Sequence, residues 1–589
     1  MSDTLFLKLR SNIMIEDDVD LAEREIKSIF SRVSRAQVAN DVIKSISLPK
    51  EIINGNSRKC APIGFIATEN RCSLWELALR LSFVQEIWLE GSSKDNGLAP
   101  AQWWIEHSFN NKRYCCILPM MASAELLSYL KGKSIDKSDF ERMIATIAKG
   151  TDEKSRFLEP LRRRNTSAPH VHGLHRYKAK FFPRMIRSIL VSERNQLPEV
   201  EEGRIVILDP FVGSGTTLVE ASLLGLESIG IDIDPLSVLI SKAKLDVLKL
   251  ESQTKLDAAI NKVKIEAGPL YATTRGGEKY RFPSWIERKF ERTKSHGQQR
   301  KYEDEISAWR SAISDIEEQR VREILEVCLS DAISRKFNIR MMGTGVGRFA
   351  LEIGNTDLSI IMNSNLDRLK QMASVCSTIK SIYDVHPAPS KVIEDTAISM
   401  PLKTESVSMV MTSPPYLPAS SGRENYLLGK SISITALNLM SENEIVHAEG
   451  RSIGSMKTFG ESDLESLPQE VNDAYVWLKS DPLRKIKAEP VASYYSELKK
   501  ALLETHRVLL PGGLAAYVIG KESIFYEFKS RKTLYRVDCA GIFQQIAFDC
   551  DFSLEERIDV QLDKKNANAR PRSLDSYYET IFILKKNAP

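Results

Sequence analysis

Two short segments of the chain carry residue types and spacings that could do chemistry. The first, residues 205–234, reads IVILDPFVGSGTTLVEASLLGLESIGIDID. It predicts an apolar strand (Ile205–Leu208), a glycine turn, a helix (Thr216–Leu224) and a second strand that ends in acid (Ile229–Asp234). Glycines let the backbone approach a ligand, and an acid roughly 20 positions further on accepts hydrogen bonds from ribose hydroxyls. We therefore expect a ribose-containing ligand at the carboxyl ends of these strands.

The second segment, Val407–Tyr416, reads VSMVMTSPPY and predicts a buried strand that ends in Ser-Pro-Pro-Tyr. Prolines lack an N–H, so they end the strand rigidly and leave carbonyls exposed. The Ser413 hydroxyl and the Pro414 carbonyl can both accept hydrogen bonds from one NH₂ group. Tyr416 offers a face on which an extruded base can stack. A plain turn or a polyproline ligand segment is the alternative, which the preceding strand disfavours.

Together the two segments resemble the amino-methyltransferases, which use S-adenosylmethionine to methylate an exocyclic amine of a nucleobase. A nicotinamide or flavin site is an alternative for Gly213-x-Gly215, but Leu218 stands where a third small residue is usual. An ordinary strand–turn–helix with tight glycine packing is the structural alternative. It is disfavoured because Asp232 lies at the expected distance from the glycines.

The resemblance implies roles for particular residues of this chain. It assigns catalysis to Ser413, Pro414, Pro415 and Tyr416. It assigns cofactor binding to Phe181, Asp209, Pro210, Phe211, Gly213, Gly215, Thr216, Asp232 and Asp395. In this family the acid of Asp-Pro-Phe contacts the methionine end of the cofactor, and the Phe packs nearby.

Two more segments lie at the places in the sequence where this family has functional motifs. Each can also be interpreted as an ordinary structural element. His175–Pro183, HRYKAKFFP, looks like the early motif that closes over the methionine moiety. Alternatively it is a basic, aromatic loop before the helix Met185–Leu190. By resemblance Asp395, in VIEDT, ends a strand and faces the cofactor adenine; otherwise it is a loop residue or a helix cap.

The rest of the catalytic region predicts alternating helices and strands. Tyr495–Gly520 reads as an amphipathic helix, a Pro-Gly-Gly stop and a buried strand. The apolar stripe of that helix is expected to be Leu498, Leu502, Leu503 and Val508. Tyr578–Lys585 reads as a last buried strand. The implied fold class is α/β: a Rossmann-like seven-stranded methyltransferase sheet with an α+β N-terminal domain and a helical insertion. The cofactor loop precedes the catalytic loop in this sequence. This order excludes the permuted arrangement of the family, in which the catalytic loop comes first.

We expect three parts: an N-terminal α+β accessory domain (1–150), a catalytic domain (165–250 and 385–589) and a helical insertion (251–384). The first opens with the strand-like TLFLKLR, a helix Leu21–Phe30 and a helical segment Ser73–Glu90. It resembles the N-terminal domain of THUMP-type tRNA methyltransferases. The insertion is a candidate target-recognition region, similar to helical insertions in some DNA methylases.

Aromatic residues in the insertion have two interpretations. Trp285, Phe290 and Trp309 lie in basic surroundings, but aromatics at helical spacing are more often core than base-stacking platforms. A further polar segment, Leu417–Pro490, directly follows the catalytic tetrapeptide. We expect it to be a flexible segment that contacts the substrate.

The composition of the chain bears on its location and on metal binding. The chain has 589 residues, no apolar run long enough to span a membrane and no signal peptide in its first residues. Its eight cysteines lack zinc spacing, which predicts reduced thiols and a cytoplasmic location. His172 and His175 could suggest a metal, but no Cys or His pair accompanies them, so we expect none.

The charge pattern bears on the partner. Net charge is only +4, so any nucleic-acid surface is local. Basic clusters occur at 162–164, 176–180, 288–301 and 564–572. Each is either a solvated face or part of a phosphate track. The sequence does not indicate an oligomeric state.

Two features of the sequence bear on which nucleobase amine is methylated, and they point in different directions. Ser413, rather than Asp or Asn, points by resemblance to cytosine N4 in DNA, as in the methylases of restriction–modification systems. The N-terminal region points instead to tRNA guanine N2, and adenine N6 in DNA is a further alternative. A catalytically silent nucleic-acid-binding protein is disfavoured, because both the cofactor and the catalytic motifs look intact.

Overall fold

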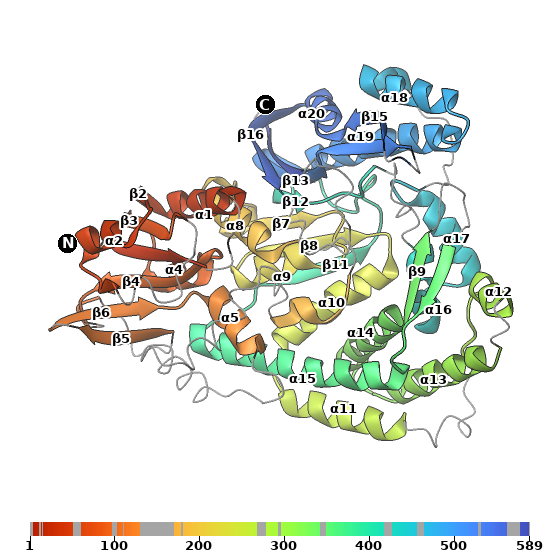
Figure 1. Ribbon diagram of the computed structural model, residues 1–589, viewed down its shortest axis with the longest axis horizontal. Coiled ribbons are helices and arrows are strands. Elements are labelled where there is room, and N and C mark those ends of the chain that lie inside the picture. Colours follow the sequence, from red (N-terminus) through yellow and green to blue (C-terminus); the bar gives the residue numbers. More distant parts are fainter. Residues whose placement is uncertain are drawn as a thin grey trace.

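The computed structural model describes residues 4–10, 13, 16–50, 53, 61–92, 94–96, 103–109, 111–129, 170–177, 181–267, 279–292, 296–341, 349–417, 427–455, 464–527, 530, 532–561 and 578–587. An N-terminal sheet lies beside a larger central sheet, and long helices run along one side of both (Figure 1). Among these residues no helix is long and apolar enough to cross a membrane.

The central sheet has seven strands in the order β11-β8-β7-β12-β13-β17-β16. The first five are parallel to one another. At one edge β17 runs antiparallel to β13, and β16 pairs antiparallel with β17, so β16 runs in the same direction as the first five. The strands are β7 (Val206–Asp209), β8 (Glu227–Asp232), β11 (Ser390–Glu394), β12 (Val407–Thr412), β13 (Leu509–Gly520), β16 (Phe552–Gln561) and β17 (Tyr578–Lys586). The expected seven-stranded α/β methyltransferase sheet is confirmed.

Alternate residues of the central strands enter two different cores. Ile207 and Met409 pack on the face covered by α8 (Pro183–Glu193), α9 (Thr216–Leu223) and α10 (Pro235–Lys249). Leu208 and Val410 pack on the other face, which α19 (Ala488–Val508) and α20 (Cys539–Asp549) cover. A parallel sheet covered on both faces needs apolar side chains on both, which is why its strands read as continuous apolar runs.

The helix α19 corrects one detail of the sequence analysis. It ends at Val508, directly before the Pro-Gly-Gly stop, and β13 begins at Leu509. Leu498, Leu502 and Val508 are buried as expected, but Leu503 is 49% exposed. The prediction for Leu503 was wrong because it lies about 100° around the helix from Leu502, outside the stripe facing the sheet.

The N-terminal sheet is antiparallel and has six strands in the order β2-β3-β1-β4-β6-β5. Its strands are β1 (Leu5–Leu9), β2 (Phe30–Ala36), β3 (Gly64–Asn70), β4 (Val84–Glu90), β5 (Trp104–Phe109) and β6 (Lys112–Ile117). The helices with it are α1 (Glu16–Ile29), α2 (Ala39–Ile46), α4 (Leu74–Arg80) and α5 (Met120–Tyr129).

The segment Ser73–Glu90 is not one helix. Ser73 and Glu76 form a capping box that starts α4, which ends at Arg80 because Leu81 adopts an extended conformation. Val84–Glu90 is the strand β4, paired with β1 and β6. The helical prediction was wrong here because the apolar residues of a central strand, buried on both sides, imitate those of a buried helix.

Polar contacts join the N-terminal region to the central sheet. Arg24 of α1 pairs with Glu193 of α8 and lies 2.7 Å from Glu556 of β16. The Trp75 indole donates a hydrogen bond to the carbonyl of Tyr383, at 2.7 Å. Because both contacts end on elements around the central sheet, they hold the two sheets together.

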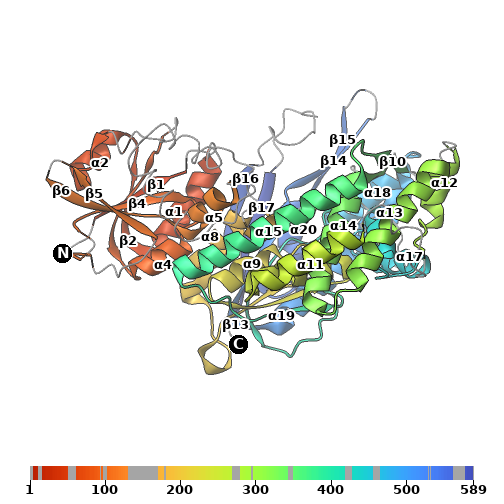
Figure 2. The ribbon, with the colours of Figure 1, turned by 90° about the horizontal axis from the view of Figure 1, so that it is seen from below.

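The region 251–384 is mostly helical, as expected, with one added β-hairpin. Its helices are α11 (Gln253–Glu266), α12 (Ser284–Arg292), α13 (His296–Ser314), α14 (Gln319–Lys336) and α15 (Leu358–Tyr383). The hairpin pairs β9 (Phe337–Met341) with β10 (Phe349–Ile353). The helices α11, α14 and α15 pack together along one side of the molecule (Figure 2). Phe290 and Trp309 are buried and Trp285 is half-buried, so the first two belong to the core.

The segment that follows the catalytic strand has regular structure over much of its described length, contrary to the expected flexible segment. It contains the 3-10 turn η4 (Leu428–Lys430) and the helices α16 (Ser431–Ala436), α17 (Glu442–Arg451) and α18 (Gln469–Ser480). Its helices form because α17 begins with a capping box at Ser441 and Glu444, and buried apolar residues line each helix. A hairpin of β14 (Glu522–Tyr526) and β15 (Thr533–Asp538) leads away from the end of β13.

Candidate active site

The glycine turn connects β7 with α9 at the carboxyl edge of the central sheet. Gly213 and Gly215 both have positive φ, +48° and +73°. A Cβ on Gly215 would lie 2.9 Å from the Cβ of Ser241, closer than real Cβ contacts. The turn therefore requires glycine at this position both for its backbone conformation and for its packing.

Asp232, the last residue of β8, holds that turn. Its carboxylate accepts hydrogen bonds from the backbone N–H groups of Gly213, at 2.8 Å, and Asp234, at 3.0 Å. Loss of water and the neighbouring Asp234 carboxylate raise the pKa of Asp232 to about 6. Because a carboxylate has about four acceptor positions, Asp232 can also accept from a ribose hydroxyl.

Asp209 joins the two sequence motifs. It is buried and accepts hydrogen bonds from the hydroxyl of Thr412, at 2.6 Å, and from the N–H of Phe211, at 3.1 Å. Burial raises the pKa of Asp209 to about 6. Thr412 directly precedes Ser413, so this contact places the Ser-Pro-Pro-Tyr tetrapeptide, predicted to be catalytic, beside the glycine turn.

Four other predicted cofactor residues differ in how deeply they are buried. Pro210 and Thr216 are buried within it. Phe211 and Phe181 are half-buried and pack against different core clusters on opposite faces of the sheet. The structure therefore does not pack these two rings into one cluster.

Asp395 directly follows β11, as the resemblance implies. Its backbone N–H donates to the carbonyl of Asp232, at 3.1 Å. Its carboxylate accepts from the N–H of Thr396, at 2.7 Å. The ends of β8 and β11 therefore meet, and both acids lie at one edge of the sheet.

Tyr416 is held at the surface of this edge. Its hydroxyl donates to a carboxylate oxygen of Glu579, at 2.8 Å. A Cβ on Gly520 would lie 3.4 Å from the Tyr416 ring, so the ring rests on that glycine. Tyr416 is nevertheless 39% exposed, which leaves ring surface available for stacking.

The rest of the tetrapeptide is supported from beneath. The Pro415 carbonyl accepts a hydrogen bond from the Tyr494 hydroxyl, at 2.9 Å. Pro414 is buried and Ser413 is half-buried, and the Ser413 hydroxyl interacts with the Tyr416 hydroxyl. Tyr494 and Glu579 were not found by the sequence analysis, because nothing in their local sequence marks a partner so far along the chain.

The basic aromatic motif reaches the glycine turn through Tyr177, while residues 178–180 lie outside the described residues. A Cβ on Gly213 would lie 3.4 Å from the Tyr177 ring, and the Tyr177 and Ser237 hydroxyls are 2.9 Å apart. His175 Nε2 lies 2.9 Å from the Ser330 hydroxyl. Burial lowers the pKa of His175 to about 4, so the ring is neutral at physiological pH.

An ion network anchors the turn η1 (His170–Gly173) that precedes this motif. His172 Nε2 lies 2.7 Å from one carboxylate oxygen of Glu220, and Arg187 lies 2.5 Å from the other. One ligand atom each of His170, His172 and Glu220 lie within 4.8 Å of one another. The adjacent guanidinium repels a metal ion, so we assign the group to ion pairing that fixes η1 on α9.

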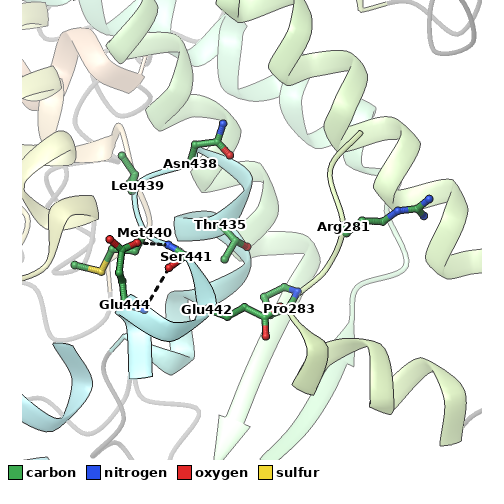
Figure 3. Close-up of a pocket in the computed structure, with 9 residues that line it drawn as sticks. All are labelled: Arg281, Pro283, Thr435, Asn438, Leu439, Met440, Ser441, Glu442 and Glu444. Carbon is green, nitrogen blue, oxygen red and sulfur yellow. Dashed lines mark hydrogen bonds between the residues drawn. The ribbon is translucent and has the colours of Figure 1, made fainter. Parts of the chain in front are cut away.

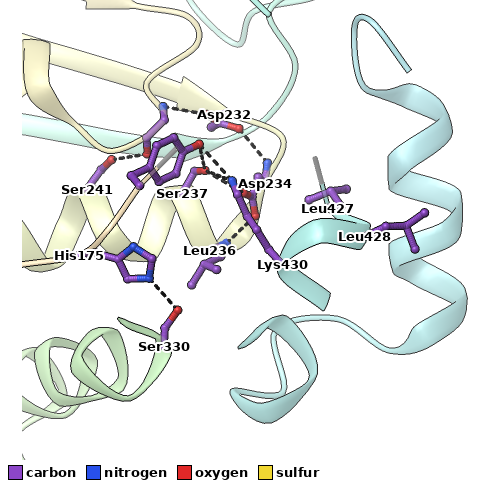
Figure 4. Close-up of polar contacts among 12 residues, drawn as sticks. His175, Asp232, Asp234, Leu236, Ser237, Ser241, Ser330, Leu427, Leu428 and Lys430 are labelled. Carbon is purple, nitrogen blue, oxygen red and sulfur yellow. Dashed lines mark hydrogen bonds and ion pairs between the residues drawn. The ribbon is translucent and has the colours of Figure 1, made fainter. Parts of the chain in front are cut away.

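A lysine that the sequence analysis missed lies beside Asp232 and Asp234. Lys430, the last residue of η4, pairs with the Asp234 carboxylate at 2.5 Å (Figure 4). Its ammonium also lies 4.4 Å from the centre of the Tyr177 ring. The segment after the tetrapeptide therefore returns to the cofactor turn.

A separate surface pocket of about 490 Å³ is not part of this site. It lies between Pro283 and the start of α17 (Figure 3). Its acids serve as structural acceptors: Glu444 caps α17, and Glu442 accepts from Ser284. None of its lining residues is among the predicted site residues.

The structure describes only part of the basic clusters that were predicted as a phosphate track. Residues 162–164 and 564–572 lie outside the described residues. Of the cluster 288–301, Lys289 lies over the Phe349 ring and Lys301 pairs with Asp357. These lysines have partners within the fold, so the cluster is at least partly structural.

Comparison with known proteins finds similarity to DNA methylases. Residues 85–243 match the family model N6_N4_Mtase, described as DNA methylase. This match contains the glycine turn and Asp232 and ends before the tetrapeptide. The chain is 23% identical over 417 residues to the Type II methyltransferase M.MvaI of Kocuria varians, covering 65% of this chain and 84% of that enzyme.

The matched part of the chain is thus similar to DNA methylases. The chain is also 44% identical over 87 residues to the Type II methyltransferase M.MjaII of Methanocaldococcus jannaschii, 15% of either chain. A third relative, M.BsoBI of Geobacillus stearothermophilus, is 30% identical over 129 residues, 22% of this chain and 24% of that enzyme. The chain thus spans less than two thirds of these last two enzymes in the matches. TrmN from Thermus thermophilus aligns over 99% of both chains at 11% identity, with a TM-score of 0.27.

The match to the DNA methylase family model supports S-adenosylmethionine as the cofactor. The residues present fit such a group. The glycine turn has no room for a Cβ at Gly215, and Tyr177 lines it at Gly213. Asp232 presents a half-buried carboxylate at the end of β8. Phe181, Asp209 and Asp395 remain predicted cofactor residues.

Proposed function

We propose that this methylase transfers a methyl group from S-adenosylmethionine to N4 of cytosine in DNA, with the target base turned out of the duplex. The observation that carries the proposal is the hydrogen bond between Thr412 and Asp209, at 2.6 Å. It brings the tetrapeptide, which suits an exocyclic amine, to the same sheet edge as the cofactor turn. Methylation of a nucleobase amine needs those two sites side by side.

The tetrapeptide is proposed to activate the amine. The cytosine amine is a poor nucleophile because its lone pair is delocalised into the ring. The Ser413 hydroxyl and the Pro414 carbonyl would each accept one N–H, since Tyr494 already engages the carbonyl of Pro415. Two acceptors pull the nitrogen toward tetrahedral geometry and free the lone pair.

The bound cofactor supplies a methyl group on a positively charged sulfur. The remaining task of the protein is to align nitrogen, carbon and sulfur. Such positioning can contribute on the order of 7 kcal/mol or more. Asp209 and Thr412 serve this alignment because their hydrogen bond fixes the distance between the two sites. No cysteine nucleophile is required.

Tyr416 is proposed to stack on the extruded base. Its exposed ring rests on Gly520, and Glu579 orients its hydroxyl. A base that leaves the duplex loses its stacking partners, and an aromatic face compensates part of that loss.

The choice of cytosine in DNA rests on Ser413 and on the relatives. By family resemblance Ser at this position favours cytosine N4, whereas adenine N6 and tRNA guanine N2 enzymes more often carry Asp or Asn. The match of residues 85–243 to a family model described as DNA methylase supports DNA as the nucleic acid. The division into residues 1–150, 165–250 with 385–589, and 251–384, and nucleic-acid contact by the first and last of these, stay predictions.

One experiment tests the substrate. Purified protein is incubated with methyl-labelled S-adenosylmethionine and either duplex DNA or tRNA, and the digested nucleosides are separated. We expect labelled N4-methylcytosine from DNA. N6-methyladenine, or N2-methylguanine from tRNA, would keep the mechanism and overturn the substrate. Absence of label from both nucleic acids, while the protein binds the cofactor, would indicate a silent binding protein.

A further inference from the structure

Lys430 makes a dense set of contacts at the ribose-binding end of the proposed cofactor site. Its ammonium lies 2.5 Å from the Asp234 carboxylate and 3.1 Å from the Tyr177 hydroxyl (Figure 4). It also lies 3.4 Å from the Ser237 hydroxyl. Asp234 in turn caps α10, accepting from the N–H of Leu236 at 2.9 Å. The lysine is therefore fixed on the rigid start of a helix.

The backbone that carries Lys430 is anchored from the opposite side. The N–H groups of Leu427 and Leu428 donate to one carboxylate oxygen of Glu449, at 2.8 and 3.0 Å. Glu449 lies in α17 and is fully buried. The segment that follows the tetrapeptide is thus clamped between α17 and the end of β8, with Lys430 as its contact on the cofactor side.

The two carboxylates beside Lys430 favour a cation at its position. Asp232 and Asp234 are two carboxylates two positions apart in the sequence, and the Asp234 carboxylate disfavours the ionised form of Asp232. Loss of water and Asp234 raise the pKa of Asp232, whereas the Lys430 ammonium lowers it. The carboxylate of Asp234 is the main attraction that raises the pKa of Lys430. The other titratable or charged groups at this end are His175, Tyr177, Lys242, Lys244, Glu394 and Asp395.

We propose that Lys430 is a positioning residue of the cofactor site, which keeps Asp232 ionised for the ribose hydroxyls and ties the segment after the catalytic tetrapeptide to the cofactor turn. This proposal rests on the cofactor site assigned above. Lys430 acts through Asp232 and Tyr177 rather than on the reacting atoms. It explains why the turn η4, which follows the tetrapeptide in sequence, lies beside Asp234.

The sign of the pH effect follows from the chemistry. Only the ionised Asp232 accepts hydrogen bonds with both oxygens, so affinity for S-adenosylmethionine is full above about pH 6 and falls as the pH drops below it. Without the Lys430 cation, Asp232 takes up its proton at a higher pH. The affinity for S-adenosylmethionine therefore begins to fall at a higher pH than in the wild type. Asp209 also titrates near pH 6 but is unchanged in every variant, so the difference between variants isolates the effect of Lys430.

The test is the affinity for S-adenosylmethionine, measured by calorimetry on the full chain without nucleic acid from pH 5.5 to 8.5. Lys430→Met should move the midpoint of the pH dependence upward by about one unit and weaken binding at pH 6 by up to about tenfold. Lys430→Arg should restore most of the affinity and the midpoint. Lys586→Met is the matched control, because Lys586 pairs with one carboxylate, Glu405 at 3.2 Å, near the start of β13, where its Nζ donates to the carbonyl of Leu509.

The outcomes separate this proposal from the others. An unchanged midpoint and affinity in Lys430→Met would overturn it. Equal losses in Lys430→Met and Lys430→Arg, with no shift of the midpoint, would reduce Lys430 to a structural contact and also overturn it. Wild-type protein that fails to bind S-adenosylmethionine would overturn the cofactor site itself. Wild-type protein that binds the cofactor but methylates a different base would leave this proposal standing.

Discussion

The two ends of the proposed site are built differently. At the cofactor end, Asp232 accepts two backbone N–H groups and Asp209 accepts one hydroxyl and one N–H, all within the fold. At the base end, Tyr416 is held through its hydroxyl, which contacts Glu579 and Ser413, and it keeps 39% of its surface exposed. The carboxylates of the first end are tied to the backbone and to a neighbouring strand, whereas the second end presents an exposed aromatic ring.

This difference matches the two ligands. A small cofactor can be surrounded, so its site benefits from side chains that the backbone has already oriented. A base belongs to a long polymer and must enter from outside, so its site needs an open aromatic face. We expect substitutions at the cofactor end to change cofactor affinity, and those at the base end to change turnover or affinity for nucleic acid.

The largest expected effect is at the base end. Ser413→Ala should lower turnover by roughly 10²–10³-fold, by analogy with removing one transition-state hydrogen bond. Its affinity for S-adenosylmethionine should stay nearly unchanged, because the lost contact is to the base. Single-turnover methylation and calorimetry measure the two quantities. Ser406→Ala is the control, because Ser406 lies just before the same strand and its hydroxyl donates to the carbonyl of Lys403. Wild-type turnover in Ser413→Ala would show that the tetrapeptide is a structural turn.

The next effect is at the cofactor end. Asp232→Ala should weaken S-adenosylmethionine binding by about 1.5–3 kcal/mol, the scale of a hydrogen bond to a charged group. Calorimetry at pH 7.5 measures the loss, and circular dichroism checks that the fold is intact. Asp367→Ala, at an exposed acid paired with Lys264, is the control. Unchanged affinity in a folded Asp232→Ala variant would contradict the ribose assignment and with it the comparison of the two ends.

The smallest effect concerns Glu579. Glu579→Ala removes the acceptor for the Tyr416 hydroxyl, which is worth about 1 kcal/mol for a single hydrogen bond. The KM for nucleic acid should rise about fivefold, with little change in kcat or in cofactor affinity. Glu579→Gln keeps an acceptor and should behave almost as the wild type. A loss of cofactor affinity in Glu579→Ala would show that the two ends are not independent.

Local sequence was enough to predict the cofactor turn. Its strands, its glycines and Asp232 lie within about 30 consecutive residues, and their conformations depend on local apolar runs and on the absence of a Cβ. The resemblance also predicted the seven-stranded sheet. In contrast, the helix expected over Ser73–Glu90 was half strand, because burial on both faces removes the periodicity that distinguishes the two.

The sequence by itself determined the strand-end motifs, the family resemblance and the residue types that suit a nucleobase amine. Only the tertiary structure decided that Thr412 meets Asp209, that Glu579 and Gly520 support Tyr416, and that Lys430 returns to Asp234. These contacts join residues between about 100 and 200 positions apart. Their existence depends on how strands order within a sheet and how helices pack on it, and no local propensity encodes a partner at such a separation.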